Sequence, residues 1–112
     1  MKSIVASVAT ALALLAGQVA AASAPPPAQA SRTASVIIDN FKFHPRALAV
    51  RRGTTVVFSN SARVAHTATD RGVFDSGRIR PGRSFSVRFG QKGTFAYHCK
   101  IHRFMRGKIV VG

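Results

Sequence analysis

Short segments of alternating apolar and polar residues recur over the C-terminal two thirds of the chain, and no helical period is sustained anywhere. Side chains alternate between two faces along a β-strand, so this pattern predicts half-buried strands. Within each segment, a set of apolar residues shares one face. These sets are Val36 and Ile38; Leu48 and Val50; Val56 and Phe58; Phe85, Val87 and Phe89; Phe95, Tyr97 and Cys99; and Ile109 and Val111. We expect these apolar faces to form the core.

Turn sequences separate these segments, and they are Arg52-Gly53, Asn60-Ser61, Pro81-Gly82 and Gln91-Lys92-Gly93. Two further short strands are predicted at Thr67–Thr69 and Val73-Phe74, on either side of Asp70-Arg71-Gly72. About eight short strands within some 80 residues predict an all-β fold, a Greek-key β-sandwich.

The N-terminal segment has a different pattern. Met1-Lys2 gives it a basic start, and Ile4–Gly17 is an unbroken run of apolar or small residues, followed by small-residue cleavage options. This is typical of a secretory signal peptide, and we expect it to span residues 1–22 with cleavage near Ala22. The alternative is an uncleaved membrane anchor, because the apolar stretch up to Ala24 could just span a bilayer.

The segment 23–32 contains Pro25-Pro26-Pro27 and small residues, a composition typical of an extended tether. The domain is then expected at 33–112. A chain of 112 residues supports one domain, and a single cysteine excludes an intrachain disulfide. We expect a monomer exported to the periplasm, or a membrane-anchored form that faces the periplasm.

One stretch carries potential metal ligands. Cys99, His102 and Met105 follow the spacing C-x2-H-x2-M, and they lie in the turn between the last two predicted strands. A second imidazole, that of His66, is predicted beside a strand end. Zinc sites usually take four strong donors, and a thioether is a poor one. One cysteine and two histidines with a weak axial methionine is the blue-copper arrangement.

Each of these residues also has a simpler interpretation. Cys99 or Met105 alone fits a core position, and His66 or His102 alone fits an ordinary polar site. A lone thiol without a metal is unexpected in an exported protein, because oxidising compartments convert exposed thiols to disulfides or sulfenic acids. The four residues together favour a copper site.

The sequence resembles the cupredoxins, the small blue copper proteins, and within them the amicyanin group. The matching segments are Gly93–Cys99 and Phe104–Val111 together with the short ligand loop, and more weakly Asn40–Pro45, Gly53–Val56 and His66–Thr69. The resemblance implies that His66, Cys99, His102 and Met105 bind one type 1 copper ion. It also implies an eight-stranded sandwich, periplasmic one-electron transfer, and partner docking at an apolar patch around His102.

Three features depart from that pattern. Arg103 stands where the family commonly has proline, so a charge lies in the expected docking patch. The segment between His66 and Cys99 looks shorter than in amicyanins and carries Phe74-Asp75-Ser76-Gly77. Thr67 stands where some relatives have an asparagine that braces the cysteine loop, and its hydroxyl is expected to make a similar bond.

The formal net charge of +14, from 17 basic and 3 acidic residues, has two interpretations. In the first, the charges only keep the surface solvated. In the second, they steer the protein to an acidic cytochrome or dehydrogenase or to an anionic membrane surface. Lys100, Arg103 and Arg106 make the ligand loop itself basic. Export, and the lack of an aromatic platform among the basic residues, argue against nucleic acid as partner.

Two functions remain open at this point. The first is a soluble electron carrier, and the second is a copper-binding protein for storage, delivery or tolerance. An enzyme is not expected, because His44 and His98 are the only spare imidazoles and three acidic residues offer no paired carboxylates. We expect His98 to point outward as a surface residue, the alternative being a part in an electron route.

Overall fold

The structure is a computed structural model and describes residues 32–112. In this part of the chain there is no helix, and nine strands follow one another in the order β1 (Arg32–Asp39), β2 (Lys42–His44), β3 (Ala47–Val50), β4 (Thr54–Asn60), β5 (Thr69–Asp70), β6 (Phe74–Asp75), β7 (Ser84–Phe89), β8 (Gly93–His98) and β9 (Arg106–Val111). The described residues include no helix long and apolar enough to cross a membrane.

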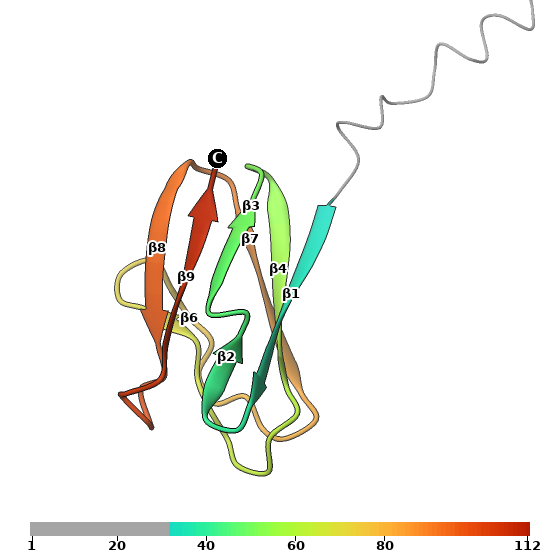
Figure 1. Ribbon diagram of the computed structural model, residues 1–112, viewed down its shortest axis with the longest axis vertical. Coiled ribbons are helices and arrows are strands. Elements are labelled where there is room, and N and C mark those ends of the chain that lie inside the picture. The colour runs from blue at the N-terminus through green and yellow to red at the C-terminus, as the bar shows by residue number, and fades with distance from the viewer. Residues whose placement is uncertain (1–31) are drawn as a thin grey trace, which may run out of the picture. The chain divides into compact units, whose positions relative to one another are not determined.

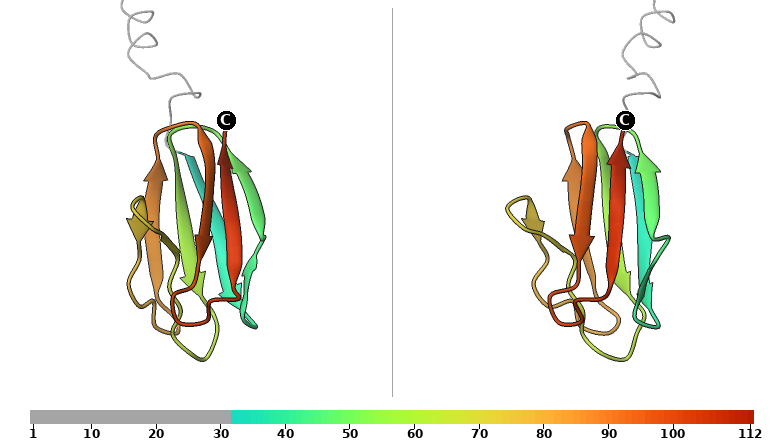
Figure 2. Two further views of the ribbon diagram at one scale, coloured as in Figure 1. Left: turned by 90° about the vertical axis from the view of Figure 1, so that its left-hand side faces the viewer. Right: turned by 60° about the vertical axis from the view of Figure 1, so that its left-hand side comes forward.

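The strands form two sheets that pack face to face (Figures 1 and 2). One sheet has the order β2-β1-β4-β7, and the other has the order β3-β9-β8-β5-β6. Two pairs are parallel, β1 with β4 and β3 with β9, and the remaining pairs are antiparallel. Chain neighbours such as β3 and β4 lie in different sheets, so the connections cross between layers. The predicted all-β sandwich is confirmed.

The core lies between the sheets, and the predicted apolar faces contribute most of it, together with Phe43, Ala68, Ile79 and Met105. Val36, Ile38, Val56, Phe58 and Ile109 are fully buried. Every second residue along β4 is buried, as expected for a strand with one face on the core.

Tyr97 lies at the centre of the aromatic part of the core. Its ring packs edge-on against Phe43 and Phe58, with centroids 4.7 and 5.2 Å apart. Burial raises the pKa of Tyr97. These contacts join the two sheets, because Phe43 and Phe58 belong to one sheet and Tyr97 to the other.

Two local predictions differ from the structure. β2 was not among the predicted strands, because three residues with one buried side chain, that of Phe43, are too few to establish an alternation. The short strands predicted at Thr67–Thr69 and Val73-Phe74 are the two-residue strands β5 and β6, each shifted toward the C-terminus. Thr67 instead lies in the loop between β4 and β5, which also carries the predicted ligand His66.

The predicted signal peptide at 1–22 and nearly all of the tether at 23–32 lie outside the described residues. Arg32 already belongs to β1, where it is aligned with Thr54 of β4. The described sandwich therefore begins one residue before the predicted domain start at 33. At one end of the sandwich the β1–β2 turn, the β4–β5 loop and the β8–β9 loop lie together (Figures 1 and 2). The candidate site is built from these three segments.

Candidate metal centre

Three predicted donor atoms converge at this end of the sandwich. Cys99 Sγ lies 3.8 Å from His66 Nδ1 and 3.9 Å from His102 Nδ1, and the two ring nitrogens are 3.2 Å apart. All three donors lie within 4.8 Å of one another, and they form the one such cluster of His, Cys and acidic groups among the described residues. Residues 33 positions apart in the sequence thus face a common point.

The β8–β9 loop is folded back on itself, and this places Cys99, His102 and Met105. The Cys99 backbone N–H donates to the Met105 carbonyl at 3.1 Å, and the Met105 N–H donates to the His102 carbonyl at 2.9 Å. Cys99 is fully buried and Met105 is 2% exposed, whereas His102 is half-buried. The loop therefore directs the cysteine and methionine inward and leaves one imidazole at the surface.

His66 is held by a β-bridge to Ile79, with reciprocal backbone hydrogen bonds of 3.2 and 2.7 Å. Asn60 braces both sides of this bridge. Its Nδ2 donates to the carbonyls of Val64 and Ile79 at 2.9 and 2.8 Å, and its Oδ1 accepts from the Ala62 N–H at 2.8 Å. Asn60 looked like a simple turn residue in the sequence, and its bracing role was missed.

Among the described residues, the ring of His66 has polar contacts with the other members of the cluster alone. Its Nε2 is buried and has no hydrogen-bond partner among the described residues, while its Nδ1 faces Cys99 and His102. Desolvation first, and the nearby His102 second, lower the pKa of His66. A neutral imidazole with a free Nδ1 lone pair is the form that ligates a metal.

Backbone groups surround the sulfur of Cys99. The Thr67 N–H and the His102 N–H both point at Sγ, at 3.3 and 3.4 Å. Two such donors in a buried site stabilise negative charge on sulfur, and the thiolate is the metal-binding form of cysteine. The environment of the sulfur therefore suits a metal ligand. An ordinary buried thiol does not require two N–H donors.

The side chain of Thr67 makes the bond expected of it. Its Oγ1 accepts a hydrogen bond from the Lys100 N–H at 2.8 Å, and this ties the His66 segment to the Cys99 loop. The same oxygen is 3.0 Å from Thr69 Oγ1, which donates to Asp75 Oδ1 at 3.1 Å. The prediction that a hydroxyl can brace the loop is confirmed.

Asp75 completes this network at the surface. Its carboxylate pairs with the ammonium group of Lys100, and it also accepts from the Gly77 N–H at 2.9 Å. The bond from Lys100, followed by the bond from Gly77, lowers the pKa of Asp75 to about 2. Asp75 was noted in the sequence only as part of a family segment, and nothing in the pattern indicated its link to the loop.

Two exposed phenylalanines flank the half-buried imidazole. The rings of Phe41 and His102 meet edge-on with centroids 5.1 Å apart, and Phe104 lies 6.3 Å from His102. Phe41 is 44% exposed and Phe104 is 70% exposed. The apolar surface expected around His102 is therefore present, and Arg103 is exposed beside it.

The other two histidines lie apart from the cluster. The ring of His44 makes a 3.1 Å hydrogen bond with the Asp39 carbonyl at an exposed position. His98 is half-buried on β8, where it is aligned with Thr69 of β5 and Arg106 of β9. His98 is therefore only partly exposed, whereas an outward position at the surface was expected.

A thiolate and two imidazoles on a rigid β-sandwich define a small copper protein of the type 1, or blue, class. The comparisons with known proteins agree. A family model described as "Cupredoxin-like domain" matches residues 6–111, so the chain belongs to this family.

Amicyanin-alpha of Methylorubrum extorquens is 30% identical over 86 residues, which cover 68% of this chain and 69% of that protein. A solved Cu(I) form of an amicyanin variant has a TM-score of 0.68 and 30% identity, covering 82% of this chain and 89% of the other. A copper-containing nitrite reductase from Thermus scotoductus has a TM-score of 0.68 and 26% identity, but only 22% of that enzyme is covered. Within the family, the chain is thus amicyanin-like.

Proposed function

We propose that this protein carries single electrons by cycling one copper ion between Cu(I) and Cu(II), with His66, Cys99, His102 and Met105 as ligands. The observation that carries the proposal is the convergence of two Nδ1 atoms on a buried sulfur that accepts two backbone N–H groups. Soft sulfur donors favour Cu(I), and imidazole suits both oxidation states.

The protein's contribution is to hold this compromise donor set rigidly. Cys99 and His66 are buried at the ends of hydrogen-bonded segments, and Thr67 ties those segments together. Met105 is buried at the end of the same loop, where its thioether would supply the weak fourth ligand. A site that rearranges little between oxidation states is suited to rapid electron exchange.

His102 is the proposed route for electrons. It is the one half-buried member of the cluster, and the exposed rings of Phe41 and Phe104 flank it. Apolar surface around a redox centre allows close, desolvated contact with a partner, while the exposed Arg103, which follows His102 in the loop, attracts acidic groups. We therefore propose an acidic redox protein, such as a cytochrome or dehydrogenase, as the partner of a monomeric carrier.

The location proposed for this function is the periplasm. It is supported by the basic start and apolar run within residues 1–22. An anionic membrane surface is a second place where the excess of basic residues would attract the protein. Cell fractionation, with antibody detection, tests the proposal, and recovery of the protein in the cytoplasm would contradict it.

The first experiment is to add Cu(II) to purified protein and to record the visible spectrum and a cyclic voltammogram. We expect an intense thiolate-to-copper charge-transfer band, a reversible one-electron couple, and loss of the band in Cys99→Ala. His44→Ala is the matched control, because this imidazole lies outside the cluster, and it is expected to keep the band. A colourless, folded protein that binds only Cu(I) would instead favour copper storage or delivery.

A carrier rather than an enzyme is proposed because the cluster is the one candidate metal site in residues 32–112. The spare imidazoles of His44 and His98 lie on different strands, β2 and β8, of different sheets. The likeness to one domain of a nitrite reductase provides a direct test. Nitrite supplied with a chemical reductant should be consumed no faster with the copper protein than with Cys99→Ala.

A further inference from the structure

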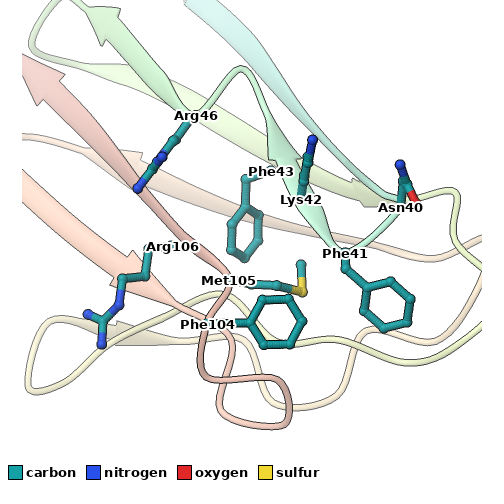
Figure 3. Close-up of a pocket in the computed structure, with 8 residues that line it drawn as sticks. All are labelled: Asn40, Phe41, Lys42, Phe43, Arg46, Phe104, Met105 and Arg106. Carbon is teal, nitrogen blue, oxygen red and sulfur yellow. The ribbon is translucent and has the colours of Figure 1, made fainter.

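A groove of about 440 Å³ opens beside the centre, on the side of Met105 (Figure 3). Phe43 and Met105, both almost fully buried, form its floor. The exposed rings of Phe41 and Phe104, whose centroids are 6.2 Å apart, form its apolar wall. The groove thus continues the apolar surface around His102 toward β2 and the start of β9.

The rest of the groove's rim is basic. Lys42, Arg46 and Arg106 line it, and of the described residues that line it none is acidic. Arg46 and Arg106 also line a second hollow of about 380 Å³, which includes Lys108. Within residues 32–112 the one ion pair is that of Lys100 with Asp75, so these cations have no acidic partner there. The guanidinium groups of Arg46 and Arg106 therefore lie between the two hollows, and no carboxylate of the described residues pairs with them.

We infer that this groove receives an acidic segment of the redox partner, with carboxylates on Arg46 and Arg106 and an apolar side chain against Phe104. This inference rests on the proposed electron-carrier function and adds to it the place and orientation of the contact. An arginine fork binds a carboxylate through two parallel hydrogen bonds, which gives orientation as well as attraction. Because Met105 forms the floor, the occupied groove holds the partner against the copper centre.

A small acidic cytochrome serves as the probe, added to the isotope-labelled Cu(I) protein and followed by NMR. We expect the shifted backbone resonances to gather at residues 40–46 and 104–106. Arg46→Glu should weaken binding about tenfold or more and flatten its salt dependence. Arg51→Glu is the matched control, because Arg51 lies near Gly112 at the opposite end of the sandwich and its reversal changes net charge equally.

Two results would overturn the inference. One is a map of shifts centred on the arginines of the loops at 61–65 and 78–83, and the other is equal weakening by Arg46→Glu and Arg51→Glu. Either result leaves the electron-carrier proposal intact if the variants keep the charge-transfer band and the reversible couple. Loss of that band in wild-type protein would instead contradict the proposed function itself.

A second, independent observation concerns the backbone of the β1–β2 turn. Asn40 and Phe41 both have positive φ, 49° and 56°, and they form a two-residue connection between Asp39 and Lys42, which are aligned across the two strands. Glycine, asparagine and aspartate favour this left-handed conformation, whereas a bulky aromatic residue is strained in it. Strain of this kind persists where the surroundings require that residue.

The contacts of Phe41 show what its ring does. It packs edge-on against both imidazoles of the cluster, with centroids 5.7 Å from His66 and 5.1 Å from His102. Phe41 reaches them from the sheet that does not contain the Cys99 loop. The geometry points to Phe41 as a positioning residue that fixes the planes of both imidazoles.

Phe41→Gly, Phe41→Ala and Phe41→Tyr test this role. In the metal-free protein, Gly should be about tenfold more favourable than Ala in the folding equilibrium, since only Gly relieves the left-handed strain. In the Cu(II) protein, Gly and Ala should both change the EPR rhombicity and slow electron self-exchange, and Tyr should restore both. A residue that only supports the fold would change stability and leave the EPR spectrum as in wild type, and that result would overturn the proposal.

Discussion

Thr67 Oγ1 accepts a hydrogen bond from the backbone N–H of Lys100, at 2.8 Å and across 33 residues of sequence. Thr67 directly follows His66, and Lys100 directly follows Cys99, so this bond joins the two segments that carry the donor cluster. The Thr67 N–H also points at Cys99 Sγ. One residue thereby fixes both the loop and its sulfur.

Thr67→Val tests this connection, because valine keeps the shape of threonine and removes the acceptor. The Lys100 N–H then loses its partner in a partly buried place, so we expect a loss of about 1–2 kcal/mol in the free energy of unfolding. Thr67→Ser keeps the acceptor and should lose less. Chemical denaturation of the metal-free proteins measures both values, and equal stability of the Val and Ser variants would contradict the role of the hydroxyl.

The Asp75 carboxylate gives the metal-free protein a specific pH dependence. Its pKa is lowered from 3.8 to about 2 in the folded state, chiefly by the bond from Lys100. A lowered pKa contributes stability that is present above about pH 4 and is lost as the pH falls toward 2. In Asp75→Asn this part of the acid destabilisation should disappear.

The measurement is the free energy of unfolding between pH 2 and pH 6, with wild type and Asp75→Asn compared. Lys100→Met supplies the control, because it removes the main cause of the shift while the carboxylate keeps its bond from Gly77. Its acid destabilisation should be intermediate between those of the other two proteins. Parallel curves for wild type and Asp75→Asn would show that the carboxylate does not couple to folding.

Much of this architecture follows from the sequence because its causes are local. Alternation identified the faces that become the core, and the spacing of Cys99, His102 and Met105 placed potential ligands in one turn. The partners of those residues come from distant segments and have no periodic signature. Asp75, for example, reaches the loop because its strand β6 pairs with β5 and β5 pairs with β8. Phe41 reaches it from a left-handed turn that contains no glycine. Such contacts depend on how the sheets pack.

Gly107 provides a steric test of the packing under the site. It is aligned with Tyr97 across β8 and β9, and a Cβ at this position would overlap the phenol ring and hydroxyl of Tyr97. Gly107→Ala is expected to destabilise the protein by about 1–3 kcal/mol. The Tyr97 hydroxyl is buried without a partner among the described residues, so Tyr97→Phe alone should cost little.

The double variant separates these effects. Removal of the hydroxyl makes part of the room that the new methyl group needs, so Gly107→Ala should cost less in the Tyr97→Phe background. Thermal unfolding of the four proteins gives the coupling directly. Gly112→Ala is the control, because nothing lies near a Cβ at that position. Strict additivity of the two substitutions would argue against the predicted clash.

Arg103 is exposed beside His102, where its charge should favour the Cu(I) state of the proposed centre. A unit charge at about 10 Å contributes roughly 0.4 kcal/mol in water, equivalent to about 20 mV for one electron. Arg103→Glu reverses the charge, so we expect the reduction potential to fall by at most about 40 mV at low ionic strength. Salt should reduce the difference, because it screens exposed charges. Voltammetry of Arg103→Glu and of the distant control Arg51→Glu tests this, and equal shifts in the two variants would mean that net charge, and not proximity, sets the potential.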